Sequence, residues 1–340
     1  MTSSKDETSS ATSVYNFAHS FLQDRGALRL ALAGAASGLV SAAMVTPLDV
    51  VKIRLQNQYY LPGVAPKYKG TLPTLAKIWR EEGLRGLFSG LTPSVYAYLP
   101  NQIIWFSIYH EAKRTLANDL GTPPEGTTIV HLLATLSASV ACTIAVSPLW
   151  VVRTRLMAQS TIPGEPHAYH YTSTGQAFST IIKTEGWSAL YKGLGPSLLG
   201  VSHSLIMFPS YERLKTEIRD RGHGTNPDGT LTNTSILIAS SISKCIASLA
   251  TYPHEVIRTR LQTQKTHIVV NNIELVDGKL ETQTTTKAVE PKYRGVVQTA
   301  KVLIREEGAI SLYRGLTTSI IRQVPAGALS LWIYELVLKL

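Results

Sequence analysis

The sequence predicts an all-α membrane protein with six transmembrane helices in three tandem repeats of about 100 residues. A ten-residue phrase occurs three times, as PLDVVKIRLQ at 47–56, PLWVVRTRLM at 148–157 and PHEVIRTRLQ at 253–262. A Glu-Gly step follows each phrase, at 82–83, 185–186 and 307–308. Six long runs also contain almost no charged residue. A fixed internal period identifies a repeat architecture, and each run approaches or exceeds the roughly 20 residues that cross a bilayer.

The composition agrees with membrane helices that surround a wet interior. Charged residues make up 16% of the chain, which is low for a soluble protein, whereas the mean hydropathy of +0.06 is low for an ordinary membrane bundle. The net charge of +10 favours an anionic partner, either nucleic acid, anionic lipid or an anionic solute. Cys142 and Cys245 form neither a disulfide framework nor a metal-binding spacing, so we interpret both as buried small residues.

Residues 1–24 are expected to be a flexible tail. This segment is rich in Ser and Thr and carries acidic residues. It lacks the apolar core of a secretory signal and the Arg-rich, acid-poor character of a transit peptide. We therefore expect internal targeting information and no cleavable presequence.

The weakly charged runs are the expected transmembrane helices: Leu30–Leu48, Leu91–Tyr109, Thr127–Val152, Leu194–Tyr211, Leu231–Pro253 and Leu316–Tyr334. Lys244 interrupts the fifth run and Arg322 interrupts the sixth. The runs pair into three repeats, at 25–120, 121–225 and 226–340.

The connections within the repeats have their own patterns. Amphipathic stretches near 72–83, 174–186 and 296–308 predict short surface helices that end at the Glu-Gly steps. The third repeat also carries a polar insertion, 265–292, which predicts a mobile loop.

One proline begins each repeated phrase: Pro47, Pro148 and Pro253. A proline inside a helix removes a hydrogen bond and kinks the axis, and in a membrane helix neighbouring groups or water satisfy the freed carbonyl. We therefore expect the three odd-numbered helices to bend inward at one end, where acids and bases of the phrases face adjacent helices.

Each repeat contains a proline and two bases in this order, followed by a Glu-Gly step, and the first and third repeats also have an acid between the proline and the bases. This motif, in three tandem copies of a helix pair, resembles that of the mitochondrial carrier family. The resemblance covers about residues 25–340 and implies a six-helix barrel with threefold pseudosymmetry and both termini in the intermembrane space. It further implies the mitochondrial inner membrane, a monomer without a cofactor, and bound lipid such as cardiolipin on the matrix side. Peroxisomal and plastid members leave the organelle open. A soluble armadillo-like solenoid is disfavoured because solenoid helices do not run this far without charge.

The resemblance implies a matrix-side gate of ion pairs between the odd helices. The implied pairs are Asp49 with Arg153 and Lys52 with Glu255. The third pair departs from the family pattern, because Trp150 stands where an acid is expected and leaves Arg258 at best a cation–π contact with the indole. Gln56 and Gln262 occupy the positions that brace an ion pair, but Met157 does not.

A second gate is expected at the opposite, cytoplasmic end of the even helices. If each base pairs with the acid of the next even helix, the pairs are Lys113 with Glu212 and Lys215 with Glu335. The remaining pair would join Leu338 to His110, so both partners are missing together. The reverse direction keeps only Lys113 with Glu335, so the sequence favours the first direction.

One face of the even helices matches the substrate contact positions of the family. Its candidates are Ala97, Asn101 and Trp105; Leu199 or Gly200, His203 and Met207; and Arg322, Ala326 and Ser330. Arg322 and Lys244 lie near mid-membrane, where an unpaired charge costs several kcal/mol. Because the uncharged runs hold no acid, we expect both to bind an anion that comes and goes, with pairing to a gate acid as the alternative. Trp105, His203 and Asn101 are candidates to contact a base.

Local signatures narrow the expected substrate. Trp150 and His254-Glu255 resemble the branch of the family that transports pyrimidine nucleotides, NAD, and FAD or folate. The segments at 208–215, 243–248 and 322–328 look most like the NAD carriers of fungi. The resemblance thus implies NAD+ import in exchange for a (deoxy)nucleotide by alternating access, with pyrimidine nucleotides or FAD/folate as alternatives.

Other classes of function fit less well. An enzyme is disfavoured because no Gly-rich nucleotide motif, P-loop, metal cluster or catalytic pairing stands out. A nucleic-acid partner is disfavoured because the basic residues recur at helix ends instead of forming one patch. A proton-leak or purely structural membrane protein stays an alternative, and it would show no saturable exchange of solute.

Overall fold

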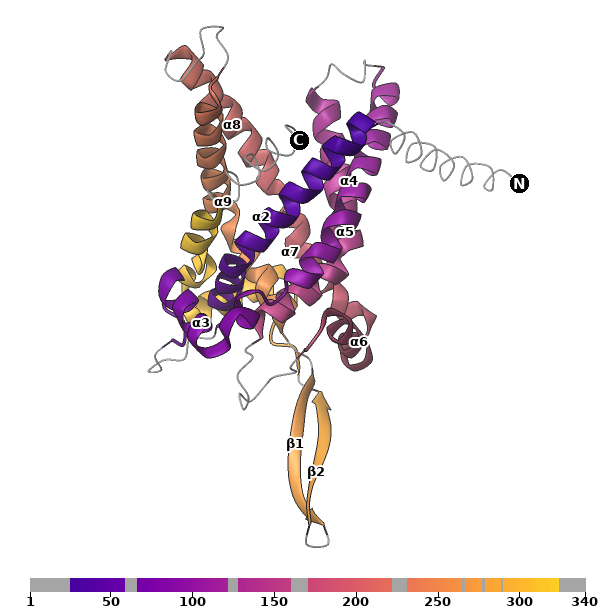
Figure 1. Cartoon of the computed structure of the whole chain (residues 1–340), viewed down its shortest axis with the longest axis vertical. Coiled ribbons are helices and arrows are strands. Elements are labelled where there is room, and N and C mark those ends of the chain that lie inside the picture. The colour runs from indigo at the N-terminus through magenta and orange to yellow at the C-terminus, as the bar shows by residue number, and fades with distance from the viewer. Residues whose placement is uncertain are drawn as a thin grey trace, which may run out of the picture.

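The computed structural model describes residues 25–58, 66–121, 128–159, 171–221, 231–264, 267–276, 279–288 and 290–323. Within these ranges the body of the protein is helical, and one β-hairpin projects from it (Figure 1). The tail expected at residues 1–24 and the gate residue Glu335 lie outside the described residues.

Three long helices make the central contacts of the body. They are α2 (Arg25–Asn57), α5 (Thr128–Ala158) and α9 (Asn233–Thr263), and each contacts the other two. Pro47, Pro148 and Pro253 lie inside these helices, which continue beyond them. We call the end of the body that follows these prolines the proline end. The inward bend at each proline stays a prediction.

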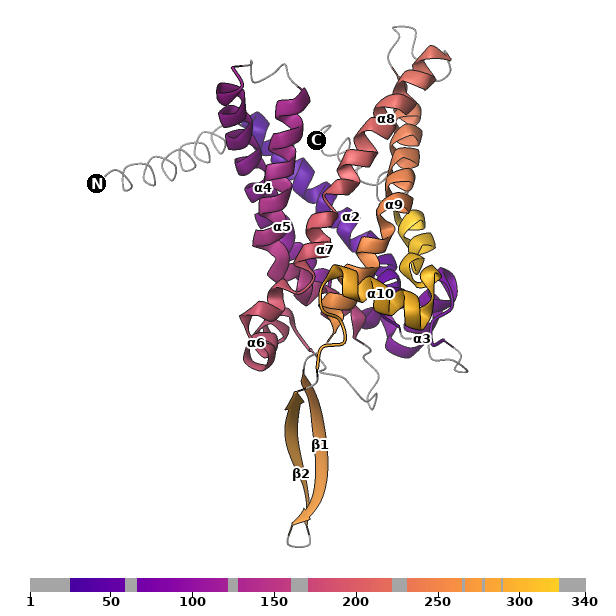
Figure 2. The same cartoon turned by 180° about the vertical axis from the view of Figure 1, so that it is seen from behind.

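The remaining long helices pack against this core in pairs. Helix α4 (Leu91–Asp119) runs along α5, and α8 (Ser202–Asp220) runs along α9 after the short α7 (Leu194–Leu199). A further helical stretch covers residues 316–323. Seen from opposite sides in Figures 1 and 2, the pair α4 and α5 diverges from the pair α8 and α9 away from the proline end. The described body is therefore tightest at the proline end.

Short helices cover the proline end, as the amphipathic stretches predict. They are α3 (Thr71–Leu87), α6 (Thr174–Glu185) with η1 (Trp187–Tyr191), and α10 (Val296–Glu307) with η2 (Ala309–Tyr313). Gly186 ends α6 with φ of 82°, and Gly308 ends α10 with φ of 81°. Only glycine adopts this conformation without strain, which explains why a glycine follows each glutamate.

Three apolar clusters join the short helices to the long ones. Ile78, Ile181 and Leu303 occupy equivalent places on α3, α6 and α10 and are at most 1% exposed. Each packs into a cluster with residues of α2, α5 or α9. The hydrophobic core of the described residues is therefore threefold repeated, with one cluster for each sequence repeat.

A buried ion pair that the sequence pattern did not predict accompanies each cluster. Glu82, Glu185 and Glu307 of the Glu-Gly steps pair with Arg54, Arg155 and Arg260 at the ends of α2, α5 and α9. The Nη1 atom of Arg155 lies 2.5 Å from Oε1 of Glu185, and both side chains are 2% exposed. Burial raises the pKa of Glu185, but hydrogen bonds from Arg155 and Lys192 outweigh this effect and lower the pKa to about 2. Each pair therefore holds the end of a short helix against a long helix.

A glutamine closes the loop after each long helix in the same way. The Gln58 side chain donates to the carbonyl of Tyr68 and accepts from its N–H. Gln159 makes the same two bonds with Tyr171, and Gln264 makes them with Tyr293. This glutamine clamp brings the loop ends together whatever the length of the chain between them.

The structure corrects the expectation of a mobile loop at 265–292, because most of this segment forms a β-hairpin. Strands β1 (His267–Val276) and β2 (Lys279–Ala288) pair antiparallel, from His267 opposite Ala288 to Val276 opposite Lys279. The physical reason is local, because both segments are rich in β-branched residues and flank an Asp-Gly dipeptide typical of two-residue hairpin turns. The hairpin extends away from the proline end (Figure 2).

The outer surface of the body fits a membrane. Among the described residues, two helices, Ile129–Ala158 and Thr234–Thr263, are long and apolar enough to span a bilayer by themselves. Large apolar side chains are exposed at helical spacing on α5, at Ile129, Leu132, Leu133, Val140 and Ile144. Such stripes are costly in water and favourable in lipid.

Candidate functional site

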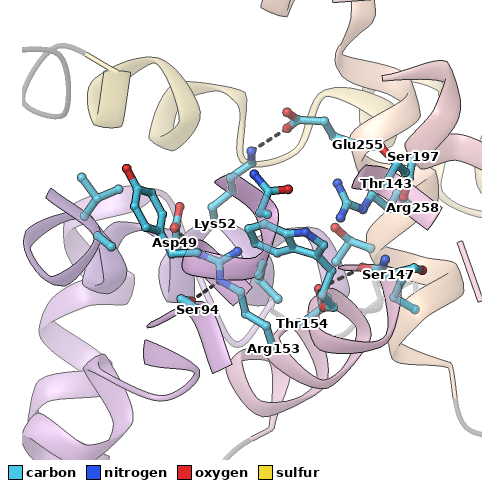
Figure 3. A pocket seen from close by; sticks show the side chains of 18 of the residues that line it. Asp49, Lys52, Ser94, Thr143, Ser147, Arg153, Thr154, Ser197, Glu255 and Arg258 are labelled. Carbon is cyan, nitrogen blue, oxygen red and sulfur yellow. Dashed lines mark hydrogen bonds and ion pairs between the residues drawn. The ribbon is translucent and has the colours of Figure 1, made fainter. Parts of the chain in front are cut away.

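A cavity of about 760 Å³ lies above the proline end, between α2, α5 and α9. Its volume falls within the range of small-molecule binding sites. Its charged lining residues are Asp49, Lys52, Arg153, Glu255, Arg258 and Arg322. Figure 3 shows several of these side chains pointing into one space from different helices.

Two ion pairs lie at the base of the cavity, as the family pattern implies. The Nη2 atom of Arg153 on α5 lies 2.5 Å from Oδ2 of Asp49 on α2. The Nζ atom of Lys52 on α2 lies 2.5 Å from Oε2 of Glu255 on α9 (Figure 3). Arg153 also donates to Oγ of Ser94 on α4 over 2.6 Å. These pairs tie α2 to both of its neighbours.

Trp150, which stands where the family pattern has an acid, places its ring between two cations, Arg153 and Arg258. The guanidinium carbon of Arg258 lies 5.9 Å from the ring centroid of Trp150, and that of Arg153 lies 5.1 Å from it. Both distances are within the range of cation–π contact. The third link between odd helices is therefore a weak one.

The glutamines do not brace the ion pairs, which corrects that expectation. Oε1 of Gln56 accepts from Thr259 and Oε1 of Gln262 accepts from Thr154, each over 2.8 Å. The glutamine of one odd helix thus bonds the threonine of another. At the third equivalent position, Met157 stands in place of the glutamine and Ile53 in place of the threonine. These two residues share an apolar cluster, so both polar partners are replaced together.

Arg322 is paired, contrary to the expectation of an unpaired cation. Its Nη1 atom lies 2.6 Å from Oδ1 of Asp49. The sequence places no acid in the same run as Arg322, but the fold brings Asp49 of α2 against it. Asp49 therefore bridges Arg322 and Arg153.

The expected substrate contacts separate into two groups. Asn101 and Trp105 of α4 line the cavity together with Arg322, and the Trp105 ring stacks on Tyr109 at 4.9 Å between centroids. The described candidates that are not among the lining residues are Ala97, Leu199, Gly200, His203, Met207 and Lys244. Ala326 and Ser330 lie outside the described residues.

These outlying candidates have structural surroundings of their own. Ala97 is 1% exposed, and Nδ1 of His203 lies 3.1 Å from Oγ1 of Thr251, which joins α8 to α9. A Cβ atom on Gly200 would lie 3.0 Å from Nε2 of His254, so the glycine allows a close approach of α7 to α9. Lys244 is half-buried and makes no ion pair with a described residue.

The pairing expected between α4 and α8 at the opposite end is absent from this conformation. Lys113 forms no ion pair with Glu212. Glu212 instead pairs over 3.3 Å with Lys215, one turn away on the same helix. The physical reason is the divergence of α4 from α8 at that end (Figures 1 and 2). The second expected pair, Lys215 with Glu335, lies partly outside the described residues.

The triplicated geometry agrees with a comparison against known families. A family model described as "Mitochondrial carrier protein" matches residues 23–120, 124–222 and 229–340. The chain belongs to the mitochondrial carrier family. It is therefore a multi-pass mitochondrial membrane transporter and not an enzyme.

Individual relatives cover most of this carrier. A mitochondrial nicotinamide adenine dinucleotide transporter of Arabidopsis thaliana is 38% identical over 90% of this chain and 78% of its own. A mitochondrial nicotinamide adenine dinucleotide transporter of Saccharomyces cerevisiae is 38% identical over 90% of this chain and 75% of its own. A mitochondrial pyrimidine nucleotide transporter of Saccharomyces cerevisiae is 30% identical over 91% and 85%. Relatives with two kinds of nucleotide substrate are thus similar to it.

Proposed function

We propose that this carrier imports NAD+ across the mitochondrial inner membrane in exchange for a (deoxy)nucleotide. The observation that carries the proposal is the charge of the cavity, which is lined by four basic and two acidic side chains. The excess of two positive charges matches a pyrophosphate group, which carries two negative charges. The relatives described as nicotinamide adenine dinucleotide transporters support the choice of this dinucleotide.

The proposed architecture is a barrel of six transmembrane helices with threefold pseudosymmetry and short helices on the matrix side. The threefold repeat of the apolar clusters, buried ion pairs and glutamine clamps supports it. In this architecture the proline end faces the matrix. The protein acts as a monomer, and lipid such as cardiolipin binds on the matrix side.

The proposed mechanism is alternating access. The ion pairs of Asp49 and Lys52 close the matrix side, while Lys113 and Glu212, described residues of the cytoplasmic gate, form no ion pair with each other in this conformation. Opening the matrix side separates two pairs that are partly exposed to the cavity. An exposed pair costs about 1 kcal/mol or less to separate, and a buried one several times more. Substrate contacts that replace the broken ion pairs offset part of this free-energy cost.

The test is exchange by the purified protein in liposomes. Uptake of labelled NAD is measured against internal NAD, AMP, UTP, FAD and folate. Saturable NAD uptake that UTP and FAD compete with weakly is the expected result. A folded protein that exchanges no nucleotide would refute the proposal.

Pyrimidine nucleotide transport is the second candidate. The relative described as a pyrimidine nucleotide transporter supports it, and the positive excess of the cavity also attracts the phosphates of a nucleoside triphosphate. Preference for UTP or CTP over NAD in the same assay would select it. FAD or folate exchange is the third outcome that the assay resolves.

A further inference from the structure

Arg258 differs from every other charged residue of the cavity. Asp49, Arg153 and Arg322 form one ion-paired group, and Lys52 and Glu255 form another. Arg258 lines the same cavity, but no described residue forms an ion pair with it or accepts a hydrogen bond from it. Of the two excess positive charges, one therefore belongs to the group around Asp49 and the other to Arg258, whose donors are available.

The contact with Trp150 does not replace a carboxylate. A cation–π contact contributes about 0.5–2 kcal/mol, and here the same ring also faces Arg153. The indole ring has no oxygen to accept the N–H groups of Arg258, so the planar guanidinium can still donate them to another acceptor. Figure 3 shows this guanidinium directed into the cavity. Such a fork matches the oxygens of a phosphate in a bidentate arrangement.

Two other basic residues of the cavity, Arg322 and Lys52, are less available to an anion than Arg258 is. Arg322 donates to Asp49, so an anion that reaches Arg322 must compete with a carboxylate. Lys52 is held by Glu255 in the same way. An anion that enters the cavity in this conformation thus meets Arg258 without displacing any described carboxylate.

We propose that Arg258 binds a phosphate of the transported nucleotide, so that the third matrix-side position is a substrate contact instead of a gate pair. The proposal rests on the proposed function as a nucleotide carrier. Trp150 orients the guanidinium from one side and, because it carries no charge, does not neutralise it. Replacing the acid of the family pattern with Trp150 therefore releases one cation to the substrate.

The first test measures binding and transport of an Arg258→Gln variant. We expect its KM for the preferred nucleotide to rise about 10- to 100-fold, which corresponds to one charge-assisted contact. We also expect inorganic pyrophosphate to raise the apparent unfolding temperature of the wild type but not of the variant. Malonate, a dicarboxylate, should have a smaller effect than pyrophosphate on the wild type. Arg305→Gln, an exposed site on α10, is the matched control.

The second test leaves Arg258 in place. Trp150→Glu should supply the missing carboxylate, raise the unfolding temperature of the ligand-free protein and still raise KM, because Arg258 is then occupied. If Arg258 served only the gate, the same variant would keep the wild-type KM and the wild-type response to pyrophosphate. Arg258→Lys, which keeps the charge but loses the fork, should raise KM several-fold and covers the case in which Arg258→Gln does not fold.

The outcomes separate this inference from the proposed function. Wild-type KM and pyrophosphate response in both Trp150→Glu and Arg258→Lys would overturn the role of Arg258 while nucleotide transport stands. A wild type that exchanges no nucleotide, but whose stabilisation by pyrophosphate depends on Arg258, would overturn the function and keep the anion site.

Discussion

Arg322 and Asp49 connect the upper part of the cavity to the ion pairs at the proline end, with 2.6 Å between Nη1 of the arginine and Oδ1 of the aspartate. The other oxygen of Asp49 lies 2.5 Å from Arg153. One carboxylate therefore serves both a cavity residue and a cross-helix ion pair. A substrate phosphate that draws Arg322 away changes the charge around Asp49, which gives a direct route from substrate binding to the proposed gate.

Replacing Arg322 with Ala should abolish transport without unfolding the protein. Exchange should fall by about 100-fold or more, because the cavity loses a charge-assisted contact. Asp49 keeps Arg153 as a partner, so the apparent unfolding temperature should change little. Arg322→Lys, which retains the charge, should recover part of the activity. Wild-type exchange rates in the alanine variant would contradict the assignment.

Charge exchange between Lys52 and Glu255 should separate pairing from position. Each single variant, Lys52→Glu or Glu255→Lys, places like charges at a 2.5 Å contact and should destabilise the protein by about 1–3 kcal/mol. The double variant restores an ion pair and should recover most of that loss. Thermal unfolding and exchange rates of all four proteins form the cycle. Additive losses in the double variant would show that the two residues do not act as a pair.

The buried pair of Glu185 and Arg155 predicts a pH dependence of stability. The pKa of Glu185 is lowered from 4.5 to about 2, so its stabilising effect is complete above about pH 4.5 and is lost as the pH falls toward 2. Glu185→Gln should therefore destabilise the protein by at most about 3 kcal/mol at neutral pH. The difference from wild type should shrink between pH 4.5 and 2. Glu306→Gln, an exposed carboxylate one residue before the Glu-Gly step, is the control and should show a much smaller difference.

Removing the hairpin should leave the helical body folded. The two strands contact mainly each other, and the bonds between Gln264 and Tyr293 close the loop that contains them. Replacing 267–288 with a short Gly-Ser linker should change stability by only about 1 kcal/mol, since loop closure depends weakly on length. NAD exchange should stay within about twofold of the wild type. Loss of exchange in a folded deletion variant would assign the hairpin a role in transport.

The glutamine clamp supplies a companion prediction. Gln264→Ala removes both bonds to the Tyr293 backbone and should cost about 1–3 kcal/mol. Gln58→Ala and Gln159→Ala should cost similar amounts, because both make the same bonds in their repeats. Thermal unfolding of the three variants checks this equivalence. A large loss at one position alone would show that the repeats are not energetically alike.

The sequence by itself determined the features that repeat or are local. The period, the short helices at 72–83, 174–186 and 296–308, and the glycine after each glutamate all follow from patterns that adjacent residues carry. The partners Asp49 with Arg153 and Lys52 with Glu255 came from the family pattern, because the same phrase recurs on neighbouring helices. The hairpin was also locally encoded, in its β-branched strands and Asp-Gly dipeptide, although we expected a loop.

Only the tertiary structure decided which groups from different helices meet. It placed Arg322 on Asp49, turned Gln56 and Gln262 toward threonines, and separated Lys113 from Glu212. Spacing along the chain gives the face of a helix on which a residue lies, but not the distance between that face and another helix. That distance depends on how the helices diverge in a given conformation, and it leaves Arg258 facing the cavity with its charge unpaired among the described residues.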